Sequence, residues 1–472
     1  MAGMVHFFLN GEEVQTTEAA GILVLDYLRQ RAQLMGTKEG CREGDCGACT
    51  VLIGELEGER VVYKPVTSCL MPLGELHGRH LVTIEGLNGE ALSPVQQAIV
   101  DEGATQCGFC TPGIVVSLMG YVMEDGAEIT SNGVKAALSG HLCRCTGYRS
   151  LKQVEPYLKA SIGEETGIEA LVANGVLSAY FLDMPERLRA IPPFGSQNGQ
   201  VSPEVFIAGG TDIYVQQGDA LPEIQVHVLN LHPEMKGISR RAGYLHVGAL
   251  TTFEEFARDP EVIRLIPEIQ DYMFLIASWQ IRNRATLGGN IINASPIGDM
   301  TVLLLALEAL LVFRDGQTSR TVPMTRFFKG YKQLDRSPSE ILTEILIPEP
   351  AARTRVGWEK VSKRKCLDIA SVNSAIKVRC EDGVIQEIGL AMGGVAPVPL
   401  YMKETMAFLT GRPISAETVQ EAFPIAQREV APISDVRGSA AYKRLLVRQL
   451  LMAHFTRLFP ELMQARDFYE TY

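Results

Sequence analysis

Alternating apolar and polar positions characterise the first part of the chain. Residues 5–14 alternate around the dipeptide Asn10-Gly11, which is typical of a β-hairpin. Apolar residues at helical spacing over 22–34 predict one helix, and the apolar runs 50–53 and 61–66 predict two short strands. This part of the chain is expected to form a small, mainly β domain.

Helical signals replace this alternation in residues 88–163. Ser93 and Thr111 are each followed by proline, a pair typical of a helix start with a capping residue and proline at the first helical position. Apolar residues at helical spacing follow both prolines. Thr146 is a candidate cap for a last helix that ends near Ile162. A helical domain is therefore predicted here.

A stretch rich in proline, glycine and polar residues follows and is expected to be a linker. Strands and helices alternate beyond it, with strand-like runs at 206–208 and 245–247 and a buried helix over 302–311. The runs 375–378 and 388–391 predict two paired strands. The predicted fold class is α+β and multidomain, with parts at 1–87, 88–163, 164–203, 204–350 and 351–472.

Composition and charge narrow the range of functions. The 472 residues carry a net charge of −11, which argues against a nucleic-acid partner because phosphate binding needs clustered Lys and Arg. The apolar run 300–313 is short and contains Glu308, so we expect no membrane span. Residues 1–10 lack the basic and apolar regions of a signal peptide, and a cytoplasmic location is expected.

Eight of the ten cysteines fall before residue 164, in two sets of four. The first set has the plant-type spacing C-x4-C-x2-C with a distant fourth cysteine, an arrangement that binds a 2Fe-2S cluster. Glycines between these cysteines allow backbone N–H groups to approach the sulfurs. The candidate ligands are Cys41, Cys46, Cys49 and Cys69.

The second set combines a C-x2-C pair with a C-x-C pair, each expected at the start of a helix. From spacing alone, structural zinc is an alternative for either set, and a stronger one here, whereas disulfides are disfavoured in a reducing compartment. The candidate ligands are Cys107, Cys110, Cys143 and Cys145. Cys366 and Cys380 have no cysteine neighbours in sequence and are expected to be small buried side chains.

Six sequence motifs together resemble those of the molybdenum hydroxylases, in particular the branch that oxidises hypoxanthine and xanthine to urate. The motifs are GCREGDCGACT (40–50), QCGFCTPG (106–113), HLCRCTGYR (141–149), FIAGGTDI (206–213), ATLGGN (285–290) and SPIGD (295–299). The resemblance covers nearly the whole chain. It implies a β-grasp 2Fe-2S domain, a helical-bundle domain with a second 2Fe-2S cluster, an α+β FAD-binding domain and a C-terminal α/β subdomain.

The resemblance also implies a set of cofactor contacts. Paired glycines suit a diphosphate, which needs backbone donors without side-chain bulk. The implied FAD contacts are Phe206, Ile207, Ala208, Gly209, Gly210, Thr211, Asp212, Ile213, Ile276, Thr286, Gly289, Asn290, Asp299, Leu342 and Lys360. Ile276 stands where the family can have an aromatic ring beside the flavin. The basic stretch 360–365 is either a site that attracts NAD⁺ phosphates or a solvated loop.

In this family, electrons from substrate oxidation at a molybdenum centre pass through the clusters to FAD and then to NAD⁺. The resemblance implies that a larger partner chain carries the molybdenum cofactor, in a dimer of heterodimers, with Gln106 and Cys145 closest to the pterin. The cluster on the second cysteine set is then proximal to molybdenum. Three alternatives are an equivalent chain acting with aldehydes or N-heterocycles, a stand-alone diaphorase and a zinc-binding scaffold without enzymatic activity.

Overall fold

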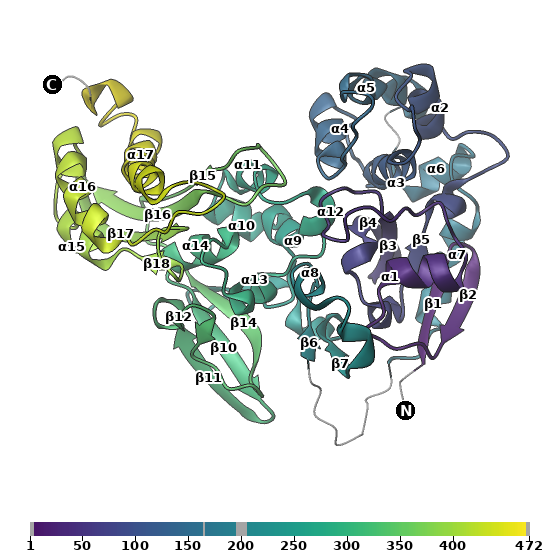
Figure 1. Cartoon of the computed structure of the whole chain (residues 1–472), viewed down its shortest axis with the longest axis horizontal. Helices are drawn as coiled ribbons and strands as arrows, with labels where there is room; N and C mark the ends of the chain where they lie inside the picture. Colours follow the sequence, from purple (N-terminus) through teal and green to yellow (C-terminus); the bar gives the residue numbers. More distant parts are fainter. Residues whose placement is uncertain (1–3, 164–165, 195–204, 469–472) are drawn as a thin grey trace. The chain divides into compact units, whose positions relative to one another are not determined.

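The computed structural model describes residues 4–163, 166–194 and 205–468 (Figure 1). The chain divides into two compact units: unit 1 comprises Met1–Leu231 and Ser278–Ala285, and unit 2 comprises His232–Ala277 and Thr286–Tyr472. The mixture of helices and sheets confirms the predicted α+β multidomain class. The expected boundary at residue 204 falls inside unit 1, because the following strands and a segment from much later in the chain pack there.

A mixed five-stranded sheet of order β2-β1-β5-β3-β4 forms the amino-terminal part of unit 1. Its strands are β1 (Val5–Leu9), β2 (Glu12–Thr16), β3 (Thr50–Glu57), β4 (Arg60–Thr67) and β5 (His80–Val82). The predicted hairpin is β1 and β2, and β1 runs parallel to β5. The helix predicted over 22–34 is a short α1 (Val24–Asp26) that continues as a π-helix, Tyr27–Arg31. Val24 and Leu28 pack in one core with Phe7.

Six helices complete the predicted helical part and extend beyond it. They are α2 (Pro94–Asp101), α3 (Thr111–Val122), α4 (Ser131–Leu138), α5 (Arg149–Ile162), α6 (Ile168–Ala173) and α7 (Tyr180–Arg189). Ser93 caps α2 as predicted, in a capping box with Gln96. The segment 164–203 is not a linker throughout, because Phe181 and Met184 of α7 are buried in the helical core although Pro185 lies inside that helix.

The remaining described residues of unit 1 include a parallel pair of short strands and two short helices. These elements are β6 (Val205–Ile207), α8 (Ile213–Gln217), β7 (Val226–Val228) and α12 (Trp279–Arg282), the last from the returning segment. The 3₁₀ turns of unit 1 are Ser68–Leu70, Leu73–Leu76, Ile84–Leu87, Leu221–Glu223 and Leu229–Leu231.

Unit 2 contains an antiparallel sheet of order β11-β10-β14-β9-β8. Its strands are β8 (Ile238–Arg241), β9 (Tyr244–Gly248), β10 (Leu310–Asp315), β11 (Thr318–Pro323) and β14 (Ile341–Pro348), with a separate pair β12 (Phe328–Gly330) and β13 (Gln333–Leu334). Its helices are α9 (Phe253–Arg258), α10 (Pro260–Leu265), α11 (Ile269–Phe274), α13 (Leu287–Asn293) and α14 (Asp299–Ala306). The helix predicted over 302–311 ends early, because the chain turns at Glu308 (φ +59°) into β10.

A second sheet, β15-β16-β17-β18, and three helices form the C-terminal part of unit 2 (Figure 1). They are β15 (Thr354–Val361), β16 (Val372–Glu381), β17 (Val384–Gly393), β18 (Leu400–Tyr401), α15 (Lys403–Leu409), α16 (Ala416–Glu429) and α17 (Ala440–Leu458). The predicted strand pair is confirmed, with Val378 opposite Ile388. Ile376 and Leu390 pack with α15 to α17, whereas Gly389 faces the carbonyl of Ala306 in α14. The 3₁₀ turns of unit 2 are Pro233–Met235, Met324–Arg326 and Ala465–Phe468.

Candidate functional site

The first cysteine set is held by a loop whose backbone N–H groups point at sulfur. Glu43 N and Asp45 N each donate to Cys41 Sγ at 3.3 Å, and Cys41 N donates to Cys46 Sγ at 3.4 Å. A hydrogen bond from the Cys46 thiol, reinforced by these N–H groups, lowers the pKa of Cys41 to about 5. The same bond, with burial, raises the pKa of the Cys46 thiol, so the loop favours one anionic sulfur in this pair, on Cys41.

The other two cysteines of this set are buried and hydrogen-bonded to each other. The bond from Cys69 lowers the pKa of the Cys49 thiol, and the same bond, with burial, raises the pKa of Cys69. Gly44 N donates to Cys69. All four predicted ligands thus meet in two pairs within unit 1, as a site that presents two thiolates to each of two iron atoms requires.

Glycine is required in this loop by lack of space and by backbone conformation. A Cβ at Gly40 would lie 2.7 Å from Cys46 Sγ. Gly44 and Gly47 have φ of +77° and +67°, and a Cβ at Gly47 would lie 2.4 Å from His141 Nδ1. The loop is a close-fitting cradle around its sulfurs, which fits a bound cluster.

The second cysteine set also forms two pairs, each joining one of its two sequence motifs to the other. Cys107 is hydrogen-bonded to Cys145, and Cys110 to Cys143. Burial, with the bond to Cys143, raises the pKa of Cys110 to about 12. Burial opposes ionisation of Cys143, but hydrogen bonds from Thr146 outweigh it and lower the pKa of that thiol.

Two expected helix caps have other roles at this second site. Cys110, not Thr111, occupies the N-cap position of α3. Thr146 does not cap α5, which begins after Tyr148 in a left-handed conformation (φ +65°). The Thr146 hydroxyl lies 3.2 Å from Cys143 Sγ. A residue that resembles a cap in sequence is therefore a hydrogen-bond partner of a candidate ligand.

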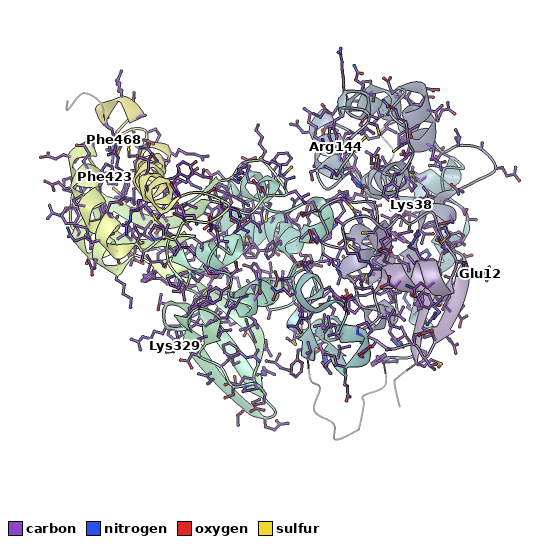
Figure 2. All side chains as sticks on the ribbon, viewed as in Figure 1. Glu12, Lys38, Arg144, Lys329, Phe423 and Phe468 are labelled. Atoms are coloured by element: carbon purple, nitrogen blue, oxygen red, sulfur yellow. The ribbon has the colours of Figure 1, made fainter. Side chains whose placement is uncertain are left out.

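Solvent reaches the second site from one side. Cys107 and Cys145 are exposed, and the apolar neighbours Phe109 and Leu142 are 48% and 49% exposed. Arg144, between two candidate ligands, is also exposed (Figure 2). The predicted residue Gln106 lies at this edge, where its Nε2 donates to Cys145 O at 3.2 Å.

The loops of the two cysteine sets touch each other directly. Leu142 N, next to Cys143, donates to the carbonyl of Cys46 at 3.0 Å. His141 is buried behind this contact, with Nε2 bound to Ser117 Oγ at 2.6 Å. Gln280 of α12 reaches the same hydroxyl at 2.8 Å. Sequence reasoning missed Gln280 because its partners lie far away in the chain.

The first predicted FAD segment, 206–213, is a strand, a glycine turn and a helix of unit 1. It comprises β6, the turn at Gly209 and Gly210, and the start of α8. A Cβ at Gly209 would lie 2.0 Å from Arg284 O, and a Cβ at Gly210 would lie 2.5 Å from Leu70 O. Because Leu70 follows Cys69, the glycine turn lies against the 3₁₀ turn Ser68–Leu70 that carries the fourth candidate ligand of the first cysteine set.

The remaining predicted FAD contacts lie in unit 2. Thr286 caps α13 by accepting from Gly289 N at 3.0 Å, and Asn290 Oδ1 accepts from Thr301 N at 3.1 Å. Helix α13 packs against β14, the strand of buried Leu342. Ile276 is buried at the end of α11. Its aliphatic side chain cannot supply an aromatic stacking face.

A buried ion pair joins two of these contacts. Lys360 Nζ lies 2.7 Å from Asp299 Oδ2 and donates to Leu275 O at 3.0 Å, so it also reaches the backbone beside Ile276. Asn373, which sequence analysis missed, donates to Asp299 Oδ1 at 2.5 Å, and its own Oδ1 is buried without a hydrogen-bond partner. An unsatisfied buried acceptor beside a charged pair is consistent with a polar ligand at this place.

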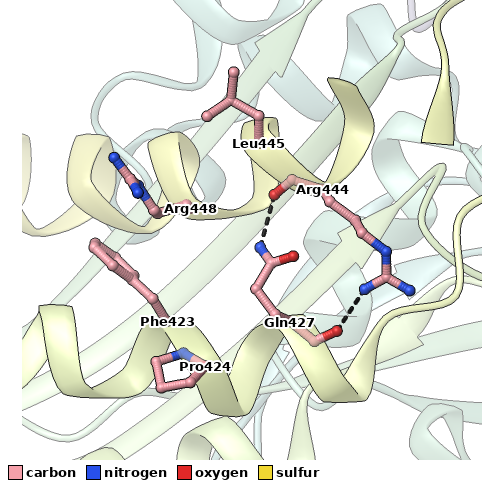
Figure 3. Close-up of a pocket in the computed structure, with 6 residues that line it drawn as sticks. All are labelled: Phe423, Pro424, Gln427, Arg444, Leu445 and Arg448. Carbon is pink, nitrogen blue, oxygen red and sulfur yellow. Dashed lines mark hydrogen bonds between the residues drawn. The ribbon is translucent and has the colours of Figure 1, made fainter. Parts of the chain in front are cut away.

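One pocket lies outside these sites, and two general observations concern the described residues. A pocket between α16 and α17 is lined by Phe423, Pro424, Gln427, Arg444, Leu445 and Arg448, none of them a predicted cofactor contact (Figure 3). Within residues 4–163, 166–194 and 205–468, no three His, Cys, Asp or Glu side chains converge as they would on a single metal ion. In the same part of the chain, no helix is both long and apolar enough to cross a bilayer.

Two paired-thiol sites in contact, with a glycine turn against one of them, define an iron-sulfur flavoprotein with an electron-transfer architecture. Family models support this class. A 2Fe-2S iron-sulfur cluster binding domain matches residues 7–74, and a [2Fe-2S] binding domain matches 83–154. A FAD binding domain in molybdopterin dehydrogenase matches 197–350, and a CO dehydrogenase flavoprotein C-terminal domain matches 359–458.

Comparison with known proteins identifies the family of this chain. Xanthine dehydrogenase of Drosophila pseudoobscura pseudoobscura is 30% identical over 97% of this chain and 39% of its own length. Carbon monoxide dehydrogenase from Hydrogenophaga pseudoflava matches with a TM-score of 0.51 and 31% identity, over 54% of this chain and 89% of that one. Quinoline 2-oxidoreductase from Pseudomonas putida 86 gives 0.50 and 28%, over 55% and 90%.

The chain belongs to the molybdenum hydroxylase family, as a member with two 2Fe-2S domains and a FAD-binding domain. It spans about two fifths of the length of the curated xanthine dehydrogenases that it matches.

Proposed function

We propose that this chain is the electron-relay subunit of a xanthine dehydrogenase. It receives electrons from a molybdenum centre on a larger partner chain, where hypoxanthine and xanthine are oxidised to urate, and passes them through two 2Fe-2S clusters and FAD to NAD⁺. The observation that carries the proposal is the continuous contact from Cys143 through Leu142 to Cys46, and from Cys69 through Leu70 to the glycine turn. One-electron carriers next to a two-electron flavin suit such a relay.

Each cofactor has a residue set that would hold it. The first cluster would bind to Cys41, Cys46, Cys49 and Cys69, and the second to Cys107, Cys110, Cys143 and Cys145. For FAD, the resemblance assigns the segment 206–213 of unit 1 and, within unit 2, Thr286, Gly289 and Asn290 and the buried set around Lys360, with Leu342 and Ile276 as apolar neighbours. When bound, FAD would supply the step from single electrons to the electron pair of a hydride.

The exposed edge of the second cysteine set supports the proposed partner. Cys107 and Cys145 are exposed, as are the apolar residues Phe109 and Leu142 close to them in sequence, and Gln106 donates to the Cys145 carbonyl. We propose that the molybdenum subunit covers this edge, in a dimer of heterodimers with the pterin nearest Gln106 and Cys145. The second cluster is then the first electron acceptor of the relay.

The NAD⁺ part of the proposal rests on the basic loop after β15. Lys363 N and Arg364 N both donate to Asp368 Oδ2, at 2.8 and 3.0 Å, which fixes the loop while leaving the Arg364 side chain more than half exposed. A fixed loop with exposed positive charge suits a dinucleotide phosphate. The loop follows Lys360, which is proposed to contact the flavin.

The test uses the native complex, purified without air. Its visible spectrum is recorded while xanthine and then NAD⁺ are added. The proposal expects xanthine to bleach the flavin and iron-sulfur absorbance and NAD⁺ to restore it. Bleaching by dithionite but not by xanthine would contradict xanthine as the substrate. Failure of NAD⁺ to restore the absorbance would contradict NAD⁺ as the electron acceptor.

A second candidate is the equivalent chain of a hydroxylase for another substrate. The similarity to quinoline 2-oxidoreductase at 28% identity favours N-heterocycles as the alternative class. In the same titration, bleaching by quinoline or an aldehyde but not by xanthine would favour this second candidate.

A further inference from the structure

A buried arginine of unit 1 bridges the 3₁₀ turn that carries Cys69 and the first predicted FAD segment. Arg284 lies in the returning segment, just before the second FAD segment in the chain, and is 3% exposed. Its Nη2 donates to Gly209 O at 2.6 Å and lies 3.4 Å from Leu70 O. One guanidinium nitrogen thus contacts the carbonyl next to Cys69 and the carbonyl of the glycine turn.

A carboxylate holds this guanidinium in place. Glu75 is also 3% exposed and accepts from both terminal nitrogens of Arg284, at 2.9 and 3.2 Å. A two-point contact of this kind fixes the orientation of the arginine fork, which a lysine cannot reproduce. Glu75 also binds Arg79 at 2.6 Å and Asn230 Nδ2 at 2.9 Å. The carboxylate is therefore fixed independently of Arg284.

The backbone segments around Arg284 are in close contact with one another. Cβ atoms at Gly209 and Gly210 would meet the carbonyl oxygens of Arg284 and Leu70 at 2.0 and 2.5 Å. Three chain segments, the 3₁₀ turn with Cys69, the glycine turn and the returning segment, therefore meet at van der Waals distance. Arg284 hydrogen-bonds both of the others.

We propose that Arg284 is a positioning residue for electron transfer between the first cluster and FAD. This inference rests on the proposed function and deepens it. By fixing the Leu70 and Gly209 carbonyls to one guanidinium group, Arg284 sets the separation between the 3₁₀ turn that carries Cys69, a ligand of the first cluster, and the glycine turn proposed to contact the flavin. Glu75 orients Arg284 and balances its charge.

The test uses the full chain loaded with both clusters and FAD, without air. The flavin is photoreduced by a light flash with EDTA as the electron donor, and electron transfer from the flavin to the first cluster is timed by the change in iron-sulfur absorbance. In Arg284→Met the transfer should slow about tenfold or more, because a misplacement of about 1 Å has effects of that size on a positioned reaction. FAD affinity, measured by ultrafiltration, should fall in the same variant.

Two further variants separate the bridge from charge and from stability. Arg284→Lys keeps the charge, so the EPR-monitored potential of the first cluster should stay near the native value while transfer remains slow. Arg79→Met breaks the same carboxylate network, but the Leu70 and Gly209 carbonyls keep Arg284, so transfer should remain at the native rate. If Arg284→Met does not fold, the rate of electron transfer in Arg284→Lys alone decides whether the inference holds.

Native transfer rates in both Arg284 variants, or equal slowing in Arg79→Met, would overturn the inference and leave the proposed relay intact. A native chain that lacks flavin, or that shows fewer than two 2Fe-2S signals by EPR, would overturn the proposed function and with it the role of Arg284.

Discussion

The two four-cysteine sites use the same pairing of thiols in opposite surroundings. In the first site Cys49 and Cys69 are buried in a small apolar cluster that includes Ile281 of the returning segment, and Cys41 and Cys46 are only partly exposed. Cys107 and Cys145 are exposed, next to Phe109 and Leu142. Both sites belong to unit 1, so the difference is one of local packing.

Under the proposed relay, this difference indicates which site faces the partner protein. The buried pair of the first site, Cys49 and Cys69, is bordered by the chain itself, and the site has the Cys46 and Leu70 backbone contacts to its neighbours. An exposed site with apolar neighbours has the features of an interface awaiting a partner. We infer that the first site is an internal relay and the second a docking site, and the following predictions test that division.

Loss of a ligand should give the largest effect and should be confined to one site. Cys69→Ser is expected to abolish or distort the EPR signal of the first cluster and leave the second signal intact, while Cys145→Ser should do the reverse. Serine keeps the size of the side chain but is a poor ligand for iron in such clusters. Cys380→Ser, which changes a cysteine outside both sets, is the control. Two intact signals in Cys69→Ser would refute the ligand assignment.

The apolar edge of the second site should matter only for the partner. Phe109→Asp is expected to weaken association with the molybdenum subunit about tenfold or more, because exposed aromatic residues are frequent anchors of interfaces. Both cluster signals should persist, and association is measured by titration of the purified subunits. Leu92→Asp, at a similarly exposed apolar position, should bind normally. Unchanged binding of Phe109→Asp would mean that this edge is not the interface.

Sequence alone identified much of the two sites because their signals are local. Spacing and motif gave all eight candidate ligands, and the structure brings each set together. It could not give Arg284, whose carboxylate partner Glu75 lies 209 positions earlier, or Gln280, which lies 163 positions from Ser117. Such contacts depend on the return of one segment to unit 1, which no local pattern encodes. For Thr146 the sequence prediction was wrong in another way. Its residue type is common at helix N-caps, but its hydroxyl instead contacts Cys143 Sγ.

Acidic pH should lower the stability of the amino-terminal sheet that supports the first site. Burial lowers the pKa of His80 in β5 to about 3, below its ordinary value of 6.5. Between these values the unfolded chain binds a proton that the folded chain does not, so stability falls as pH decreases from 6.5 towards 3, by about 1.4 kcal/mol per pH unit. Urea unfolding, followed by the absorbance of the first cluster at pH 7 and pH 5, measures this slope.

Two matched variants test this measurement. His80→Gln should lose the loss of stability with decreasing pH that is attributed to His80. His232→Gln, which changes a partly exposed histidine of unit 2, should keep that pH dependence. A slope unchanged in His80→Gln would show that another group causes the acid sensitivity. The comparison tests whether burial keeps the His80 ring neutral, against the hydrogen bond to the Asn10 carbonyl, which favours the charged ring.

The smallest effect is expected from the arginine beside each cluster, and it should differ in size between the sites. Arg42 is paired with Asp26 and Glu39, so its charge is already balanced, whereas Arg144 is exposed beside two ligands. Removing a positive charge disfavours the reduced, more negative cluster. Arg144→Ala should therefore lower the potential of the second cluster on the order of tens of millivolts, where about 59 mV corresponds to a tenfold change for one electron. Arg42→Ala should shift the first cluster less. Equal shifts in an EPR-monitored titration would mean that solvent screens Arg144 as fully as the carboxylates neutralise Arg42, and that exposure does not distinguish the two sites electrostatically.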